Sequence, residues 1–373
     1  MIAILHLLLA SCTFVYGSVI GSFLNVCIYR IPWEKSLIWP GSRCPRCLNA
    51  ILALDNVPIV GWLRLRGRCR DCAATISPRY PLIEGLVAAL FVLIYVFDVI
   101  LGPRDVIGWP ASVLFFRAGY HQLLLSFLIA ATFIDYDFFI IPDRVTVVGM
   151  AVGLLFGAIL PEIRTAPATS ISTWSGFAQS GAAGAVGFAV GWAIQAFVID
   201  LALQKSSPFP PALGLLFGFV GWRLGLSGLS VRPGSLVIGF EGLLIGGAIV
   251  WSIRILGGII LRKEAMGFGD VTLMAMIGTF LGWQPLPIIL FLAALLGLVH
   301  ALSRLCVMIV RWLRGGRFRG MSKPIPFGPY LGMAAAILMI GWPRIWSGWA
   351  ANFYEVFGVV CSWLWENAWG RSK

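Results

Sequence analysis

Apolar runs of about twenty residues or more recur along this 373-residue chain, and such runs are long enough to cross a lipid bilayer. Hydrophobic residues make up 59% of the sequence and charged residues only 12%. No soluble domain of this length needs so much apolar surface. The sequence therefore predicts an all-α polytopic membrane protein with about eight to ten transmembrane helices.

The predicted spans are separated by polar, glycine-rich or proline-rich segments. They lie near 1–26, 82–101, 112–134, 145–160, 178–203, 209–228, 235–261, 271–283, 286–310 and 327–346. The run 209–228 is rich in Gly and Pro and carries Arg223, so it could instead be re-entrant or interfacial. The Trp-rich segment 349–373 is expected to form a C-terminal helix, either as a short span or on the membrane surface.

Basic residues cluster in loops beside the predicted spans. Nine of the 28 lie between Arg30 and Arg79, and five more lie between Arg311 and Lys323. This distribution fits cytoplasmic loops of a protein whose main partner is the lipid bilayer, and it argues against nucleic-acid binding despite a net charge of +12. The first apolar run lacks a basic segment before it, so it is expected to be a retained span with its N-terminus outside.

The segment 27–80 is too polar to enter the membrane and contains CPRC at 44–47 and CRDC at 69–72. Two C-x2-C pairs with this spacing are typical of a zinc ribbon, and a reducing cytoplasmic loop favours metal over disulfides. Two disulfides or redox thiols remain the alternatives. The prediction is a small cytoplasmic domain with a structural zinc, and its ligands are Cys44, Cys47, Cys69 and Cys72.

Two aspartates stand at the ends of apolar runs in a chain that has few carboxylates: Asp135 in IDYDFFIIPD and Asp270 in GFGD. An ionised carboxylate beside hydrocarbon is costly, so each is a candidate functional residue, although an aspartate can also simply cap a helix. Two neighbouring carboxyls could share a proton and hydrolyse a peptide bond. Four apolar stretches between Arg144 and Asp270 give the even number of crossings that would return the chain to the same membrane face.

Taken in order, these motifs resemble the bacterial type IV prepilin leader peptidase family, whose members are membrane enzymes that also N-methylate the trimmed pilin. The resemblance rests on GSFLNVCIYRIP (21–32), the two CxxC pairs, YPLIE (80–84), IDYDFFIIPD, GFGD and IPFGPYLGMAA (325–335). It implies a bacterial inner-membrane peptidase, with a bundle over 81–348, that removes leaders from prepilin or pseudopilin precursors at the cytoplasmic interface.

The resemblance also assigns site residues. Asp135 and Asp270 match the catalytic pair, while Asp137 and Asp143 match supporting positions. Methyl transfer, with S-adenosylmethionine as donor, is implied for the cysteine-containing half.

Gly67 and Glu84 match positions that belong to this second activity. The sequence contains no glycine-rich nucleotide-binding fingerprint that would itself indicate a methyl donor site.

Two departures from the family pattern stand out. Thr272 occupies a position where the family usually has Lys, and the chain is enlarged over about 160–235, between the two aspartates.

Three other interpretations remain open: a peptidase without methyl transfer, a polytopic transporter with intramembrane aspartates, and a presenilin-like GxGD protease. A presenilin-like protease would lack the cysteine domain, and a transporter would be expected to show inverted repeats.

Overall fold

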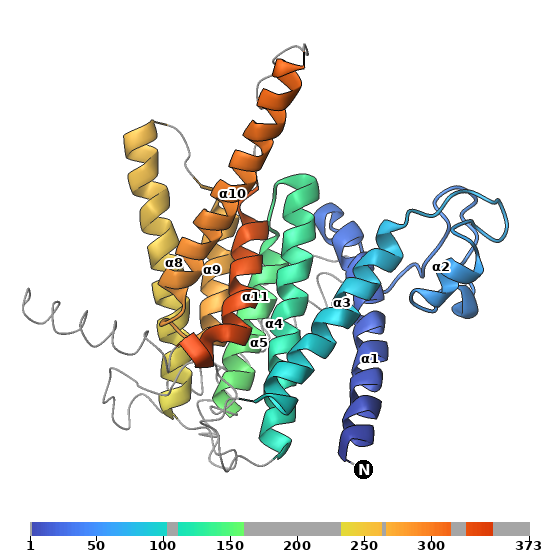
Figure 1. The fold of residues 1–373 in the computed structure, drawn as a ribbon, viewed down its shortest axis with the longest axis horizontal. Helices are drawn as coiled ribbons and strands as arrows, with labels where there is room; N and C mark the ends of the chain where they lie inside the picture. Colours follow the sequence, from blue (N-terminus) through green and yellow to red (C-terminus); the bar gives the residue numbers. More distant parts are fainter. Residues whose placement is uncertain (1, 103–110, 160–232, 263–265, 315–325, 346–373) are drawn as a thin grey trace, which may run out of the picture.

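The computed structural model describes residues 2–102, 111–159, 233–262, 266–314 and 326–345, whose secondary-structure elements are all helices, with no strand among them (Figure 1). This confirms the predicted all-α class. The elements are α1 (Ile2–Arg30), η1 (Ile31–Trp33), η2 (Ala53–Asp55), α2 (Val60–Arg64), α3 (Arg79–Tyr95), the π-helical turn η3 (Val96–Ile100), α4 (Ala111–Phe138), α5 (Asp143–Ile159), α8 (Pro233–Leu261), α9 (Phe268–Leu281), α10 (Leu286–Leu313) and α11 (Gly328–Ile345).

Five of the described helical segments are long and apolar enough to cross a membrane, so the chain is a multi-pass membrane protein. They are Ile2–Trp33, Arg79–Ile100, Ser112–Phe138, Ile238–Leu261 and Leu286–Val310. Helices α9 and α11 are apolar but shorter. The spans expected at 178–203 and 209–228, and the C-terminal helix expected at 349–373, lie outside the described residues.

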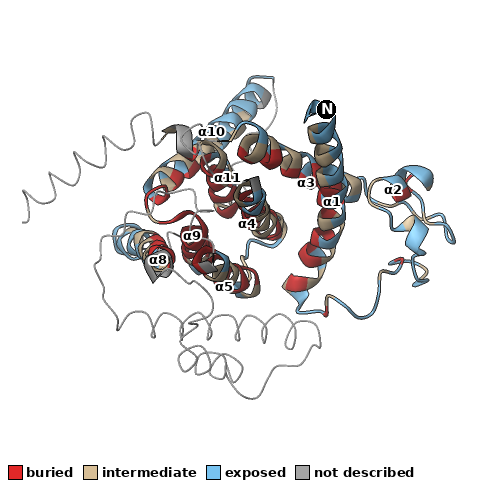
Figure 2. Cartoon of the chain, turned by 90° about the horizontal axis from the view of Figure 1, so that it is seen from below, coloured by how far each residue is buried: buried red, intermediate tan, exposed pale blue. Residues whose placement is uncertain are grey.

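Helix α9 lies at the centre of the bundle and is buried along almost its whole length, whereas α8 and α10 expose large apolar side chains on the outside (Figure 2). Such an exterior is expected where the surrounding medium is lipid. The contact between α8 and α9 is made by small residues, because a Cβ built on Gly242 would clash with the Gly278 carbonyl oxygen. Small residues at a crossing let two membrane helices approach closely.

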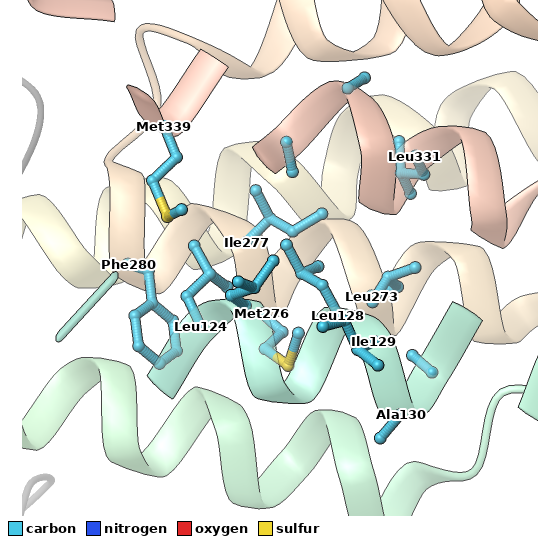
Figure 3. Close-up of a cluster of buried hydrophobic side chains, with 14 of the residues drawn as sticks. Leu124, Leu128, Ile129, Ala130, Leu273, Met276, Ile277, Phe280, Leu331 and Met339 are labelled. Atoms are coloured by element: carbon cyan, nitrogen blue, oxygen red, sulfur yellow. The ribbon is translucent and has the colours of Figure 1, made fainter. Parts of the chain in front are cut away.

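Helices α4, α9 and α11 share one apolar core (Figure 3). Leu124 and Leu128 of α4 lie against Met276 and Ile277 of α9, and Leu331 of α11 belongs to the same cluster. All five side chains are at most 2% exposed. The core therefore holds together the three helices whose ends carry the motifs IDYDFFIIPD, GFGD and IPFGPY.

Helices α1 and α3 form a close pair beside α4 (Figure 1). A Cβ on Gly17 would lie 2.8 Å from the Ala88 Cα, and one on Gly21 would lie 2.7 Å from the Glu84 Cα. Helix α1 continues to Arg30, so the first four residues of the range 27–80 expected for the cysteine domain are the last residues of this helix. This segment, which contains both CxxC pairs, lies beside the bundle at one end of α1 and α3 (Figure 1).

Candidate functional site

The two aspartates occupy facing helix ends. Asp135 lies in the last turn of α4, where its carbonyl oxygen accepts a hydrogen bond from the Phe139 N–H at 2.9 Å, and Asp270 lies in the first turn of α9. They are only 6% and 8% exposed, and Asp270 lies within electrostatic range of Asp135. Two buried carboxyls from different helices, separated by 135 positions of sequence, therefore lie near each other at one end of the bundle.

Gly328, the first residue of α11, completes the surroundings of Asp135. Its backbone N–H donates a hydrogen bond to the Asp135 Oδ2 at 3.0 Å. A Cβ built on Gly328 would lie 2.6 Å from that oxygen and 3.0 Å from the Ile141 Cδ1. The motif IPFGPY was part of the family resemblance, but the sequence alone assigned no role to Gly328. A glycine beside Pro329 at the start of a helix is the signal that could have indicated a close backbone approach.

Ile141 lies between the segment that carries Asp270 and the start of α11, which contacts Asp135. A Cβ on Gly269, in GFGD, would lie 2.7 Å from the Ile141 Cβ, and Gly328 faces the same side chain. The glycine that precedes Asp270 is thus needed for close contact with the loop that follows Asp135. Small residues on either side of Ile141 let the two helix ends approach each other.

The two expected supporting aspartates are less buried than this pair. Asp137 forms a two-pronged ion pair with Arg79 of α3, at 3.0 Å from Nη1 to Oδ1 and 2.5 Å from Nη2 to Oδ2. Asp143 begins α5 and is exposed. The structure therefore brings Asp135 and Asp270 together but directs Asp137 to an arginine that sequence reasoning did not single out.

Thr272 stands where a lysine was expected. Its Oγ1 donates to the Gly269 carbonyl oxygen at 3.0 Å, within the first turn of α9. This hydroxyl supplies no charge to Asp270, and its bond stays local to the helix that carries the aspartate.

The four predicted cysteine ligands form one cluster. All four Sγ atoms lie within 4.8 Å of one another, with 3.7 Å between Cys44 and Cys72 and 4.0 Å between Cys47 and Cys69. A tetrahedral zinc with bonds of about 2.3 Å places its thiolates about 3.8 Å apart. All four are free cysteines, and the separations are far longer than the ~2.05 Å of a disulfide. The four sulfurs are therefore placed to bind one metal ion as thiolate ligands.

The two CxxC pairs adopt the same local fold. The N–H of Cys44 donates to the Asn49 carbonyl at 3.0 Å, and the N–H of Cys69 donates to the Ala74 carbonyl at 2.8 Å. The residue after each pair has a positive φ, 62° at Leu48 and 54° at Ala73. Two such turns face each other and present their sulfurs to one point, as in a zinc ribbon.

The electrostatics of the cluster also favour a cation. Backbone N–H groups of Cys47 and Arg46 lower the pKa of Cys44 to about 6. The N–H of Asn49 acts in the same direction on Cys47, yet burial and the surrounding thiols raise its pKa overall. Crowded thiols resist becoming thiolates together unless a cation offsets their charge.

Gly67 and Glu84 both contact α2 and its start. Gly67 has φ +67°, and a Cβ there would lie 2.9 Å from the Trp62 ring. Glu84 is 8% exposed, and its Oε2 accepts a 2.7 Å hydrogen bond from the N–H of Ile59, which itself has φ +61°. A non-glycine residue in this region carries backbone strain, which is often found at functional sites. The pair thus supports α2 from its two ends.

Comparison with known proteins yields two family models. The bacterial peptidase A24 N-terminal domain matches residues 15–97, which include the cysteine cluster. The type IV leader peptidase family matches residues 187–302, which include Asp270 but not Asp135. No solved structure matches the chain.

Curated relatives match over most of their length. Prepilin leader peptidase/N-methyltransferases from Aeromonas salmonicida and Aeromonas hydrophila are 32% and 31% identical, over 88% and 92% of this chain and 90% and 94% of their own. A type 4 prepilin-like proteins leader peptide-processing enzyme from Escherichia coli is 31% identical over 85% of this chain and 88% of its own.

Proposed function

Because the chain belongs to the type IV leader peptidase family, we propose that it is a membrane aspartyl endopeptidase that cleaves leaders from type IV prepilin or pseudopilin precursors. We propose that it also N-methylates the new N-terminus, as the names of its relatives state for them. The observation that carries the peptidase proposal is that two buried aspartates, Asp135 and Asp270, lie near each other at one end of the bundle.

In the proposed cleavage, one carboxylate removes a proton from water while the other carboxyl donates a proton to the scissile carbonyl oxygen. The water oxygen adds to the carbonyl carbon. The carboxyl that took the proton from water then gives it to the amide nitrogen, while the other carboxylate takes back a proton from a hydroxyl of the intermediate. The C–N bond breaks, leaving a leader carboxylic acid, which ionises, and a new amine, and both aspartates return to their starting protonation states. The Gly328 N–H donates to the Asp135 Oδ2 and so helps to fix the orientation of the carboxyl that would exchange the proton.

We propose Zn2+ as the ion of the four-cysteine cluster, held by Cys44, Cys47, Cys69 and Cys72. Four protein ligands close the coordination sphere, so the ion would stabilise the domain rather than activate water.

S-adenosylmethionine would supply the methyl group to the new amine. Gly67 lies against Trp62, and the Glu84 Oε2 already accepts the Ile59 N–H, so we assign them to shaping α2 rather than to touching the donor.

The proposed orientation places the N-terminus of α1 outside the cell and the cysteine domain in the cytoplasm of a bacterium. It follows from the basic residues that surround the cysteines. The paired aspartates would then lie at the cytoplasmic face of the inner membrane, where a precursor exposes its hydrophilic leader and buries its apolar helix.

The test is mass spectrometry of a prepilin coexpressed with the full-length chain, which reports leader removal and N-methylation separately. Removal of the leader with methylation supports both activities. Removal without methylation identifies a peptidase that has lost methyl transfer, and an uncut precursor contradicts the proposal.

A further inference from the structure

The two ends of the cysteine domain contact the same turn of α4. On the entry side, the Trp33 ring of η1 meets the Phe138 ring edge-on, with centroids 5.9 Å apart. On the exit side, Arg79, the first residue of α3, pairs with Asp137 through two hydrogen bonds. The same guanidinium lies 5.4 Å from the centroid of the Phe133 ring. The last turn of α4 is therefore held from two directions.

Arg79 holds this turn on the side away from Asp135. Phe133 and Asp137 are four residues apart and share one face of α4. Asp135, two residues from each, lies about 200° around the helix, where its carboxyl meets the Gly328 N–H. A planar guanidinium that binds a carboxylate with two bonds and stacks on a ring can fix both position and rotation.

The turn also needs a cation for electrostatic reasons. The last turn of α4 contains Asp135 and Asp137 but no basic residue of its own. Negative side chains at a helix C-terminus oppose the helix dipole, and a nearby cation offsets this cost. Arg79 supplies that charge from a neighbouring helix. Its side chain is 42% exposed and that of Asp137 is 22% exposed, so the pair lies at the rim of the bundle.

We infer that Arg79 is a positioning residue for peptide cleavage: by pairing with Asp137 and stacking on Phe133, it fixes the turn of α4 that carries Asp135. This inference rests on the proposed catalytic role of Asp135. It gives Asp137 a role as the anchor for Arg79, distinct from any part in proton transfer.

The test compares Arg79→Gln, Arg79→Lys and Asp137→Asn in the full-length enzyme, using steady-state cleavage of a prepilin. For Arg79→Gln and Asp137→Asn we expect kcat to fall about tenfold to a hundredfold with KM nearly unchanged, because small misplacement of a reacting group has effects of this size. Arg79→Lys keeps the charge but not the two-pronged geometry, so its kcat should lie between wild type and Arg79→Gln.

A double-mutant cycle separates pairing from unrelated damage. If Arg79 acts through Asp137, the double variant Arg79→Gln/Asp137→Asn should lose no more activity than the more impaired single variant. Arg314→Gln is the matched control, because Arg314 is exposed at the end of α10 and has no ion pair within the described residues. Methylation of a pilin supplied without its leader, together with metal content, should stay at the wild-type level in all variants.

Several results would overturn the inference. The first is a kcat for Arg79→Gln within about twofold of the wild-type value. The second is a loss of kcat in the double variant equal to the product of the two single-variant losses. The third is a fall in methylation as large as the fall in cleavage. If Arg79→Gln does not accumulate in the membrane, the nearly isosteric Asp137→Asn decides by the same criteria. A wild-type chain that leaves prepilin uncut contradicts the proposed function instead, so the two failures are distinguishable.

Discussion

The backbone N–H of Gly328 donates to the Oδ2 of Asp135 at 3.0 Å, across 193 positions of sequence. This bond links the start of α11 to the last turn of α4 and helps to fix the orientation of the Asp135 carboxyl. Ile141 lies beside both Gly328 and Gly269, so the same small region brings the Asp270 turn alongside. Three motifs that are far apart in the chain thus build one site through close backbone contacts.

The first prediction concerns the paired carboxyls. Asp135→Asn and Asp270→Asn preserve size but remove the titratable group, so each should lower cleavage by at least about a hundredfold. Mass spectrometry of coexpressed prepilin measures the loss. Glu34→Gln, an exposed acidic residue next to η1, serves as the control and should cleave normally. Near-normal processing by either aspartate variant would remove that residue from the proposed pair.

The second prediction uses the glycine next to Asp135. In Gly328→Ala the new methyl group would meet the Asp135 Oδ2 at 2.6 Å, so the carboxyl must shift. Cleavage should fall by about a hundredfold, although alanine favours the helix itself. The matched control is Gly341→Ala in the same helix, where the nearest atom is the Ile345 Cδ1 at 3.6 Å. Equal activity in the two variants would show that Gly328 is not part of the site.

Much of this arrangement could be predicted from sequence because it depends on local pattern. Apolar length gave the helices, CxxC spacing gave the cysteine cluster, and motif position gave Asp135 and Asp270. The Gly328 hydrogen bond and the Arg79–Asp137 pair could not be predicted in this way. Each joins residues 58 or more positions apart, and their contact depends on how the helices pack rather than on local periodicity.

The third prediction concerns the metal. Purified protein should contain about one zinc per chain, since four thiols at these separations match one tetrahedral ion. Cys44→Ser or Cys72→Ser should release the metal and unfold the cysteine domain, because ligand assembly and folding are linked in such sites. Elemental analysis and thiol labelling measure both effects. Cys12→Ser, at an exposed position of α1, should leave metal content unchanged. Protein with four reactive thiols and no stoichiometric metal would contradict the assignment.

The fourth prediction tests whether methyl transfer depends on the shape of α2. Gly67 has φ +67° and faces Trp62, so Gly67→Ser introduces both backbone strain and a contact of about 2.9 Å with the ring. Trp62 donates from Nε1 to the Ile76 carbonyl at 3.0 Å, and a displaced ring would disturb this bond and α2 with it. We expect methylation to fall more than cleavage, because the proposed catalytic pair, Asp135 and Asp270, lies in the bundle rather than in the cysteine domain.

Gly41→Ser is the matched control for this experiment. Gly41 belongs to the same segment, and a Cβ there would meet nothing within 4 Å, so both activities should be retained. Zinc content of the Gly67→Ser protein must be measured alongside, since loss of metal would lower methylation through unfolding of the domain. A Gly67→Ser protein that keeps its zinc, yet loses cleavage and methylation in equal measure, would show that the two activities are not separated between α2 and the aspartate pair.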